Sequence, residues 1–288
     1  MKQRSAGLDL IRTLAILFVM ATHAIAHLAP MNTGIHSPKW TAYVILRFTS
    51  LCCVPLFLML TGYLNRKKKP TAAYYKGILP ILLSYAAISA LGLLYGVYTG
   101  RTSHTLFSGL RAILDYSANG YAWYVEMYIG LFLLIPFLNI LFDAIGTLRG
   151  RLLLCVLLTA ATMLPTTVAS FRVNGTSLAI FPEYWKSAYP LVYYFVGAMI
   201  AEYRPKIKVP IRALLVLLAI AVPSGLCYVY SSPSAGYAWY MMNGFGCITT
   251  GAVALTVFLA FYDVNLPKPL SFLVREISVC TFEMYLFS

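Results

Sequence analysis

The sequence predicts an all-α, polytopic membrane protein: a bundle of about nine to ten transmembrane helices with a cytoplasmic N-terminus. Hydrophobic residues make up 60% of the 288 residues and charged residues only 11%, a composition outside the range of soluble globular proteins. Apolar stretches of about 20 residues, the length that crosses the hydrocarbon core of a bilayer, recur along the chain. Basic residues gather in alternate loops, as the positive-inside rule requires.

Hydropathy windows of about 20 residues place the spans at 8–28, 41–63, 77–98, 122–142, 151–171, 187–203, 210–231 and 238–262, with a ninth starting near residue 272. Fifteen of the 22 Lys and Arg residues fall in the loops on the N-terminal side and five in the opposite loops. This bias predicts that the N-terminus is cytoplasmic. This bias accounts for most of the net charge of +13, so we expect no nucleic-acid partner. The basic run 66–69 is expected to lie against anionic lipid headgroups.

No linker or repeat divides the chain, which predicts a single integral-membrane domain over residues 1–288. The outer loop from Thr99 to Tyr121 contains an amphipathic segment behind a cap at Ser103 or Thr105, which predicts a short helix at the outer surface. Beyond Arg275 and Glu276, the apolar stretch Ile277–Ser288 provides only about 18 Å of helix. We therefore expect the chain to lack its C-terminal end, where a final helix would lie.

The first span carries titratable groups that a membrane helix should avoid. Charged residues inside a bilayer are costly, so they are functional candidates by default. Arg12 and His23 are eleven residues apart, which puts them about 20° apart around the helix and about 16 Å apart along it. Asp9 lies three residues before Arg12 and is placed to hold it. A guanidinium at the cytoplasmic end suits a phosphate-bearing ligand, and a deeper histidine suits proton transfer.

The alternative for this pair is structural. Arg12 would then extend to the cytoplasmic headgroups, and His23 would bond a backbone carbonyl within the bundle.

Two further charged residues are predicted at the depth of His23. Arg47 and Glu126 both lie in the outer third of spans that run inward, where they could orient an imidazole and bind a polar acceptor. The alternative is a structural ion pair between them. His27 follows His23 by one turn but has no supporting carboxylate, and the six cysteines show no metal-binding spacing, so we expect no metal site.

Four motifs resemble those of the acyltransferase family 3 of membrane proteins. The most specific is G-L-D-x-I-R followed by ten residues and a histidine, which contains Arg12 and His23. The others are VPLFLMLTGYL (54–64), AWYVEMYIGLFLLIP (122–136) and CTFEMYLFS (280–288). The resemblance covers nearly the whole chain.

The resemblance implies a bundle of about ten helices that takes an acyl group, commonly acetyl from acetyl-CoA, on the cytoplasmic side and delivers it to sugars of cell-surface polysaccharides or related acceptors. It also implies a catalytic role for His23 and an essential one for Arg12. Many members carry an R-x-x-R pair entering the third span, whereas this chain offers only Lys76. Some relatives carry a glutamate two positions after Glu126, where this chain has Tyr128.

We therefore expect an O-acetyltransferase of a bacterial cytoplasmic membrane. Arg12 and Lys76 would bind acyl-CoA, His23 would act on the acceptor hydroxyl, and Arg47 and Glu126 would bind the acceptor. The expected partners are membrane lipid and a cell-surface carbohydrate; the sequence predicts no oligomeric state. Two alternatives stay open. One is a transporter or flippase, although no inverted repeat is seen, and the other is a membrane sensor or anchor, although the chain has no soluble domain.

Overall fold

The computed structural model describes residues 5–27, 34–101, 103, 105–118, 122–173, 176–233, 236–238 and 241–287, without the side chains of residues 27, 106 and 173. Tyr121, at which the predicted outer loop ends, lies outside the described residues. The chain forms two compact units. The first combines Met1–Arg66 with Ile145–Thr281, and the second combines Lys67–Ala144 with Phe282–Ser288.

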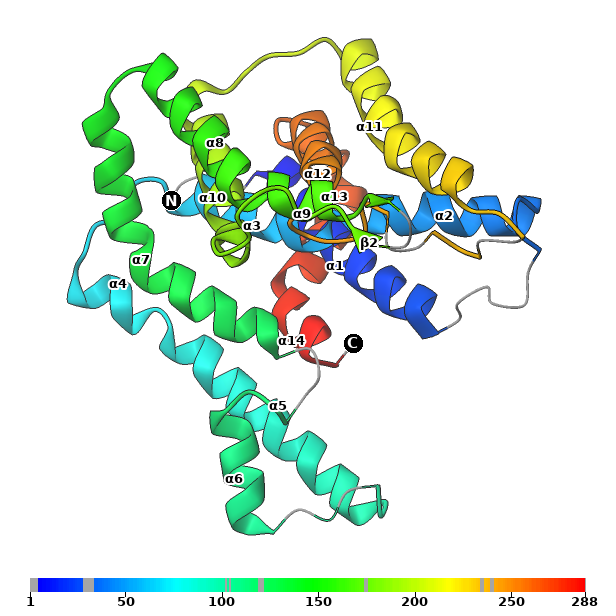
Figure 1. Cartoon of the computed structure of the whole chain (residues 1–288). Coiled ribbons are helices and arrows are strands. Elements are labelled where there is room, and N and C mark those ends of the chain that lie inside the picture. The colour runs from blue at the N-terminus through cyan, green and yellow to red at the C-terminus, as the bar shows by residue number, and fades with distance from the viewer. Residues whose placement is uncertain are drawn as a thin grey trace. The chain divides into compact units, whose positions relative to one another are not determined.

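Helix α1 is an organising element of the first unit (Figure 1). It spans Ala6–His27 and packs against α2 (Pro38–Ser50), α3 (Cys53–Asn65), α12 (Ile248–Phe261) and α13 (Lys268–Val279). Its buried residues include Ile11, Ala15 and Val19, which lie four residues apart and so form one face of the helix. The other elements of the unit are α8 (Leu148–Thr162), α9 (Leu164–Ala169), β1 (Arg172–Val173), β2 (Thr176–Ser177), η1 (Lys186–Ala188), α10 (Pro190–Tyr203) and α11 (Val209–Tyr230).

Helices α3 and α10 form the closest helix pair in the unit. A Cβ atom added at Gly62 of α3 would collide with the carbonyl oxygen of Tyr194, and one at Gly197 of α10 with the carbonyl oxygen of Met59. The two backbones can approach this closely only because both positions are glycine, as is common where membrane helices pack. Three consecutive α10 residues, Tyr193 to Phe195, are buried, so α10 is enclosed on several sides.

The second predicted span is broken into α2 and α3. Pro55, in the first turn of α3, has no N–H with which to bond the carbonyl of Leu51, and its ring crowds that carbonyl. The helix accordingly ends at Ser50 and starts again at Cys53. The break lies beside the part of α1 that carries His23, because Thr22 Oγ1 donates to Ser50 Oγ at 3.0 Å.

The second unit contains α4 (Ala72–Lys76), α5 (Leu79–Tyr98), α6 (Leu106–Leu114), α7 (Trp123–Ile145) and α14 (Thr281–Phe287). The Tyr74 hydroxyl joins α4 to α7 by donating to the Phe132 carbonyl at 2.7 Å, and Tyr85 joins α5 to α6. The predicted outer-loop helix is confirmed as α6, with Thr105 as its cap because its hydroxyl accepts from the Ser108 N–H at 3.2 Å.

The helical membrane architecture is confirmed in outline. Among the described residues, six helical stretches are long and apolar enough to cross a bilayer: Ala6–Ala26, Pro38–Asn65, Ala72–Tyr98, Trp123–Ile145, Leu148–Ala169 and Val209–Tyr230. Each overlaps a predicted span. Helices α10 and α12 are shorter, with 14 residues each, and α13 ends at Val279 before the turn to α14. The predicted count of nine to ten spans and the cytoplasmic N-terminus remain predictions.

The predicted span 238–262 is wrong in its first part. Helix α12 begins only at Ile248, and the described residues of 238–247 form a nonhelical segment. Its apolar side chains Ala238, Met241 and Met242 are buried against Trp40 and its neighbours on α2. High hydropathy indicates that these residues are shielded from water. It does not distinguish a loop buried in protein from a helix that faces lipid.

Candidate functional site

Arg12 is anchored at the N-terminal end of α1. Its Nη1 donates to Ser278 Oγ on α13 at 2.9 Å and lies 3.6 Å from Asp9 Oδ1. The Ser278 hydroxyl in turn donates to Asp9 Oδ1 at 2.8 Å, so Asp9, Arg12 and Ser278 form a closed triad. The pairing of Asp9 with Arg12 expected from their spacing is present. The arginine side chain is 26% exposed and the aspartate side chain only 7%, so the arginine is the more accessible partner.

His23 lies in the last third of the same helix, which ends at His27. Its ring is half-buried, and Nδ1 is fully shielded from solvent. The preceding residue connects it to α2, because Thr22 bonds Ser50, and the Ser50 hydroxyl donates to the Arg47 carbonyl at 3.1 Å. The end of α1 that carries His23 is therefore held beside the last turn of α2, which carries Arg47.

The half-buried Arg47 reaches into the segment that precedes α12. Its Nη2 donates to Asn243 Oδ1 at 2.8 Å. A guanidinium offers only donors, so the amide oxygen of Asn243 must face it and the amide NH2 must face elsewhere. Arg47 thereby fixes the orientation of a side chain that lies in the wall of a cavity.

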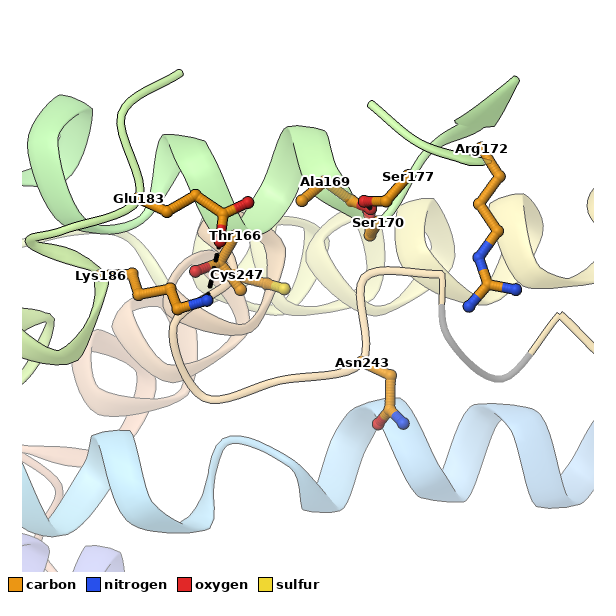
Figure 2. A pocket seen from close by; sticks show the side chains of 9 residues that line it. All are labelled: Thr166, Ala169, Ser170, Arg172, Ser177, Glu183, Lys186, Asn243 and Cys247. Carbon is orange, nitrogen blue, oxygen red and sulfur yellow. Dashed lines mark hydrogen bonds and ion pairs between the residues drawn. The ribbon is translucent and has the colours of Figure 1, made fainter. Parts of the chain in front are cut away.

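This cavity, which we call the Asn243 cavity, has a volume of about 320 Å³. It lies among α9, strands β1 and β2, the approach to η1 and the segment before α12 (Figure 2). Within it, the Lys186 ammonium pairs with Glu183 Oε2 at 2.8 Å. The lining residues are mostly polar: Thr166, Ala169, Ser170, Arg172, Ser177, Glu183, Lys186, Asn243 and Cys247. Hydroxyls, an amide, one ion pair and the guanidinium of Arg172 suit a hydroxyl-rich ligand.

The remaining predicted site residues belong to the second unit. Lys76 is the exposed last residue of α4, and Glu126 is exposed in the first turn of α7. Asp9, Arg12, His23 and Arg47 all belong to the first unit. The joint roles of Lys76 with Arg12, and of Glu126 with Arg47, remain predictions.

The Asn243 cavity was not predicted from the sequence. In the sequence, Arg172 and Lys186 counted only as charges that set topology, and Asn243 counted as part of the predicted span 238–262. A signal was present, because a polar residue inside an apparent span is a functional candidate. The short polar segment around residues 170–186 also separates two apolar stretches, and such loops often carry binding residues.

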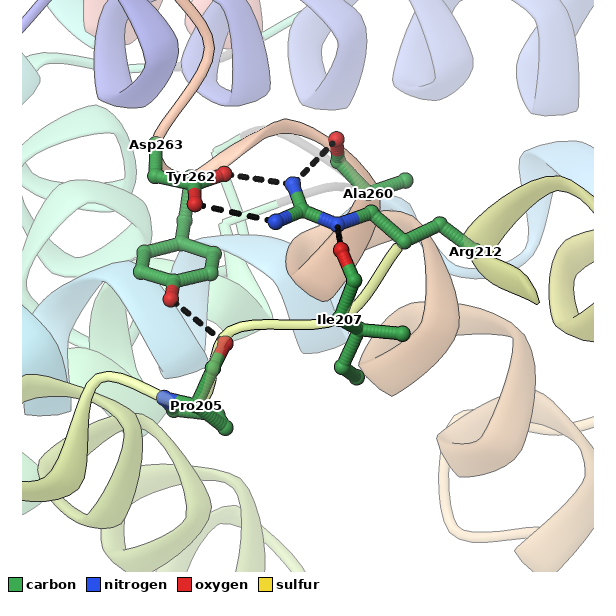
Figure 3. A network of polar contacts seen from close by, with 6 residues as sticks. All are labelled: Pro205, Ile207, Arg212, Ala260, Tyr262 and Asp263. Carbon is green, nitrogen blue, oxygen red and sulfur yellow. Dashed lines mark hydrogen bonds and ion pairs between the residues drawn. The ribbon is translucent and has the colours of Figure 1, made fainter. Parts of the chain in front are cut away.

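Several charged groups near the ends of α3, α10, α11 and α12 are structural. Arg66, part of the basic run expected at the headgroups, is buried and lies 3.3 Å from Glu202, so that expectation is wrong for Arg66; Lys67 to Lys69 are exposed. Figure 3 shows a second network, in which Arg212 binds both carboxylate oxygens of Asp263 at 2.5 and 2.9 Å. The hydrogen bond from Arg212 holds the pKa of the Asp263 carboxyl below its usual value.

Comparison with known proteins gives one match. A family model described as an acyltransferase domain, that of the acyltransferase 3 family, matches residues 5–288. No curated protein and no solved structure matches the chain.

Proposed function

Because the chain belongs to the acyltransferase 3 family, we propose that this membrane acyltransferase moves an acyl group, in the first instance acetyl, from acyl-CoA to a hydroxyl of a cell-surface carbohydrate or a related acceptor. It would then act as an O-acetyltransferase in the cytoplasmic membrane of a bacterium, modifying envelope polysaccharide. Acyl-CoA is the co-substrate, and the steps assigned to the protein need no metal.

The donor end of the site is assigned to Arg12. A guanidinium is always charged and presents a planar set of donors that matches phosphate oxygens. The triad with Asp9 and Ser278 fixes its direction while 26% of the side chain stays exposed. Lys76, exposed at the end of α4, is assigned a second contact with the phosphates of acyl-CoA.

The chemical step is assigned to His23. As general base, it removes the proton from the acceptor hydroxyl, whose oxygen attacks the thioester carbonyl. The C–S bond then breaks, the acyl group remains on the acceptor oxygen, and CoA leaves as a thiol after taking up a proton. In the covalent variant, the imidazole first displaces CoA and carries the acyl group to the acceptor. Arg47 and Glu126 are assigned to the acceptor side.

The observation that carries this proposal is the arrangement on α1. One helix holds an anchored, partly exposed arginine near its start and a half-buried histidine about 16 Å further along. The part of α1 that carries His23 lies beside the last turn of α2. Arg47 in that turn bonds Asn243, which lines a polar cavity. Transfer from a cytoplasmic donor to an outer acceptor requires a donor-binding group near the inner face and a proton-accepting group nearer the outer face.

The test is incubation of membranes containing the protein with labelled acetyl-CoA, followed by measurement of label in surface glycan. The His23→Ala variant should lose transfer by a factor of about 100 or more, as for removal of a general base, while inserting normally into the membrane. Met20→Ala, on the exposed face of the same helix, is the matched control and should retain activity. Full activity of His23→Ala would reject the mechanism. Uptake of a free solute without glycan labelling would instead indicate a transporter.

A further inference from the structure

We infer that the Asn243 cavity is the subsite that seats the sugar ring of the acceptor, and that Arg47 is a positioning residue for it and not a ligand contact. The inference rests on the proposed function and deepens it. At about 320 Å³, the cavity lies at the small end of small-molecule pockets, which span about 300–1,000 Å³. This size suits one monosaccharide unit, with the rest of a glycan outside.

The polar lining favours a hydroxyl-rich ring, and Arg172 adds guanidinium donors to it. Glu183 and Lys186 compensate each other's charge across 2.8 Å. A carboxylate has more acceptor sites than one lysine can fill, and an ammonium has three donors, so this pair can both accept from and donate to neighbouring hydroxyls. The hydroxyls of Thr166, Ser170 and Ser177 come from α9, its C-cap and β2. Sugar hydroxyls match such a mixed set because each both donates and accepts.

Asn243 gives the cavity its direction. Its amide oxygen accepts from Arg47 Nη2 at 2.8 Å, so the NH2 group is the part of the amide that can donate to a ligand oxygen. If the amide rotated by 180°, its oxygen and not its NH2 group would face the ligand. Arg47 prevents this rotation because a guanidinium has no acceptor for the NH2 group. The arginine thus selects which sugar oxygens the cavity recognises without touching the sugar.

The same arginine connects the cavity to the histidine. The Arg47 carbonyl accepts from Ser50, which accepts from Thr22, the neighbour of His23. Asn243, which would hold the ring, and the end of α1 that carries His23 are thus both joined to the last turn of α2. One hydroxyl of the seated ring, or of the next unit, would be the group that His23 deprotonates.

The kinetic test uses membranes with acetyl-CoA as donor and methyl glucoside, methyl N-acetylglucosaminide or methyl glucuronide as acceptor. Asn243→Ala should raise the KM for the glycoside about tenfold or more, as expected when a buried donor is lost, with the KM for acetyl-CoA unchanged. Arg47→Ala should give a similar increase. The double variant should add little to either single change, because both act through one contact. Lys39→Ala, exposed on the same helix α2, is the control.

Additive effects of Arg47→Ala and Asn243→Ala, or an equal loss for acetyl-CoA and glycoside, would overturn the positioning role. An unchanged glycoside KM in Asn243→Ala would overturn the subsite. These outcomes require an active wild-type protein, whereas failure of the wild type to transfer label to any acceptor would reject the proposed function itself.

A second measurement is independent of transfer. Ser177→Cys places a thiol in the exposed part of the cavity wall, and its rate of modification by a small maleimide reports occupancy. The three methyl glycosides at millimolar concentration should slow this modification. They should not slow modification of Lys39→Cys. The absence of protection by all three glycosides would contradict the inference.

Discussion

At the scale of single residues, the Ser278 hydroxyl holds the donor end of the site together. It is buried, donates to Asp9 and accepts from Arg12. Removing it leaves a buried carboxylate that faces its arginine at 3.6 Å without the bridging group. Ser278→Ala should therefore lower the free energy of unfolding by about 1 kcal/mol, the usual range for a side-chain hydrogen bond within a membrane protein, and raise the KM for acetyl-CoA.

The unfolding midpoint in detergent and the donor KM check this prediction. Ser271→Ala is the matched control, because Ser271 lies on the same helix α13 and makes no side-chain hydrogen bond among those found in the described part of the chain. An Arg12-dependent donor site would be refuted if Ser278→Ala and Ser271→Ala behaved alike in both measurements.

Residue-scale prediction from the sequence was good where one helix contained both partners. The i, i+3 spacing of Asp9 and Arg12 predicted a contact that the structure contains. It failed where the partner was distant in sequence. Asn243 is 196 positions from Arg47, and no periodicity connects them. Arg47 was instead expected to meet Glu126, whose exposed side chain belongs to the second unit.

At the scale of elements, the contact of α3 with α10 depends on two glycines. A methyl group at Gly62 or Gly197 would meet backbone carbonyl oxygens of the opposite helix, which cannot move aside as a side chain could. Gly62→Ala and Gly197→Ala should each destabilise the protein by about 1–3 kcal/mol, the usual cost of overpacking. Gly225→Ala on α11, where nothing lies within 4 Å, should be neutral or slightly stabilising because alanine favours helix.

Thermal unfolding in detergent distinguishes these cases. Equal midpoints for Gly62→Ala and Gly225→Ala would show that α3 and α10 are not packed backbone to backbone.

The Arg212–Asp263 pair joins the first turn of α11 to the end of α12 and makes this junction sensitive to acid. Arg212 lowers the pKa of Asp263 below its usual 3.8, so the pair contributes stability above that pH. The contribution disappears as the pH falls from about 4 through the lowered pKa. Since the carboxylate is 37% exposed, we expect about 1 kcal/mol or less at pH 7.

Unfolding free energies of the wild type and Asp263→Asn, measured from pH 7 to pH 2.5, check this prediction. The difference between the two proteins should be constant from pH 7 to about pH 5 and shrink towards zero below about pH 4. Glu283→Gln, at an exposed position of α14, is the control for acid effects unrelated to this junction. A difference that persisted unchanged to pH 2.5 would contradict the role of the ion pair.

Helix prediction succeeded for long apolar segments that are exposed on the protein surface, and failed for an apolar segment that is buried inside the protein. The stretch Val209–Tyr230 is apolar and largely exposed on the protein, and its predicted bounds, 210–231, agree with the structure. The segment before α12 is apolar because it packs on Trp40 and Phe48, yet it is not helical. The break between α2 and α3 could have been predicted from Pro55, because a proline removes one hydrogen bond of a helix at a known position.

At the scale of the whole molecule, one family model covers a chain that forms two compact units. Hydropathy yields a list of spans but not which spans pack together, because helix association in lipid depends on small residues and polar contacts and not on a hydrophobic difference. The sequence could therefore predict a helical membrane acyltransferase without predicting this division. Lys76 and Glu126 belong to the second unit, whereas Arg12 and His23 belong to the first. The division of the chain therefore separates residues to which the sequence assigns one site.

The orientation of the chain is the prediction on which the donor and acceptor assignments depend. The bias of Lys and Arg places the basic run 66–69 inside and the loop before α6 outside. Lys68→Cys and Ser103→Cys introduce thiols at exposed positions of these two segments. A membrane-impermeant thiol reagent applied to intact cells should modify Ser103→Cys at once, and Lys68→Cys only after permeabilisation. The wild type, with its six native cysteines, gives the background. The reverse pattern would place Arg12 at the outer face, out of reach of cytoplasmic acyl-CoA, and would remove its donor role together with the sidedness of the Asn243 cavity.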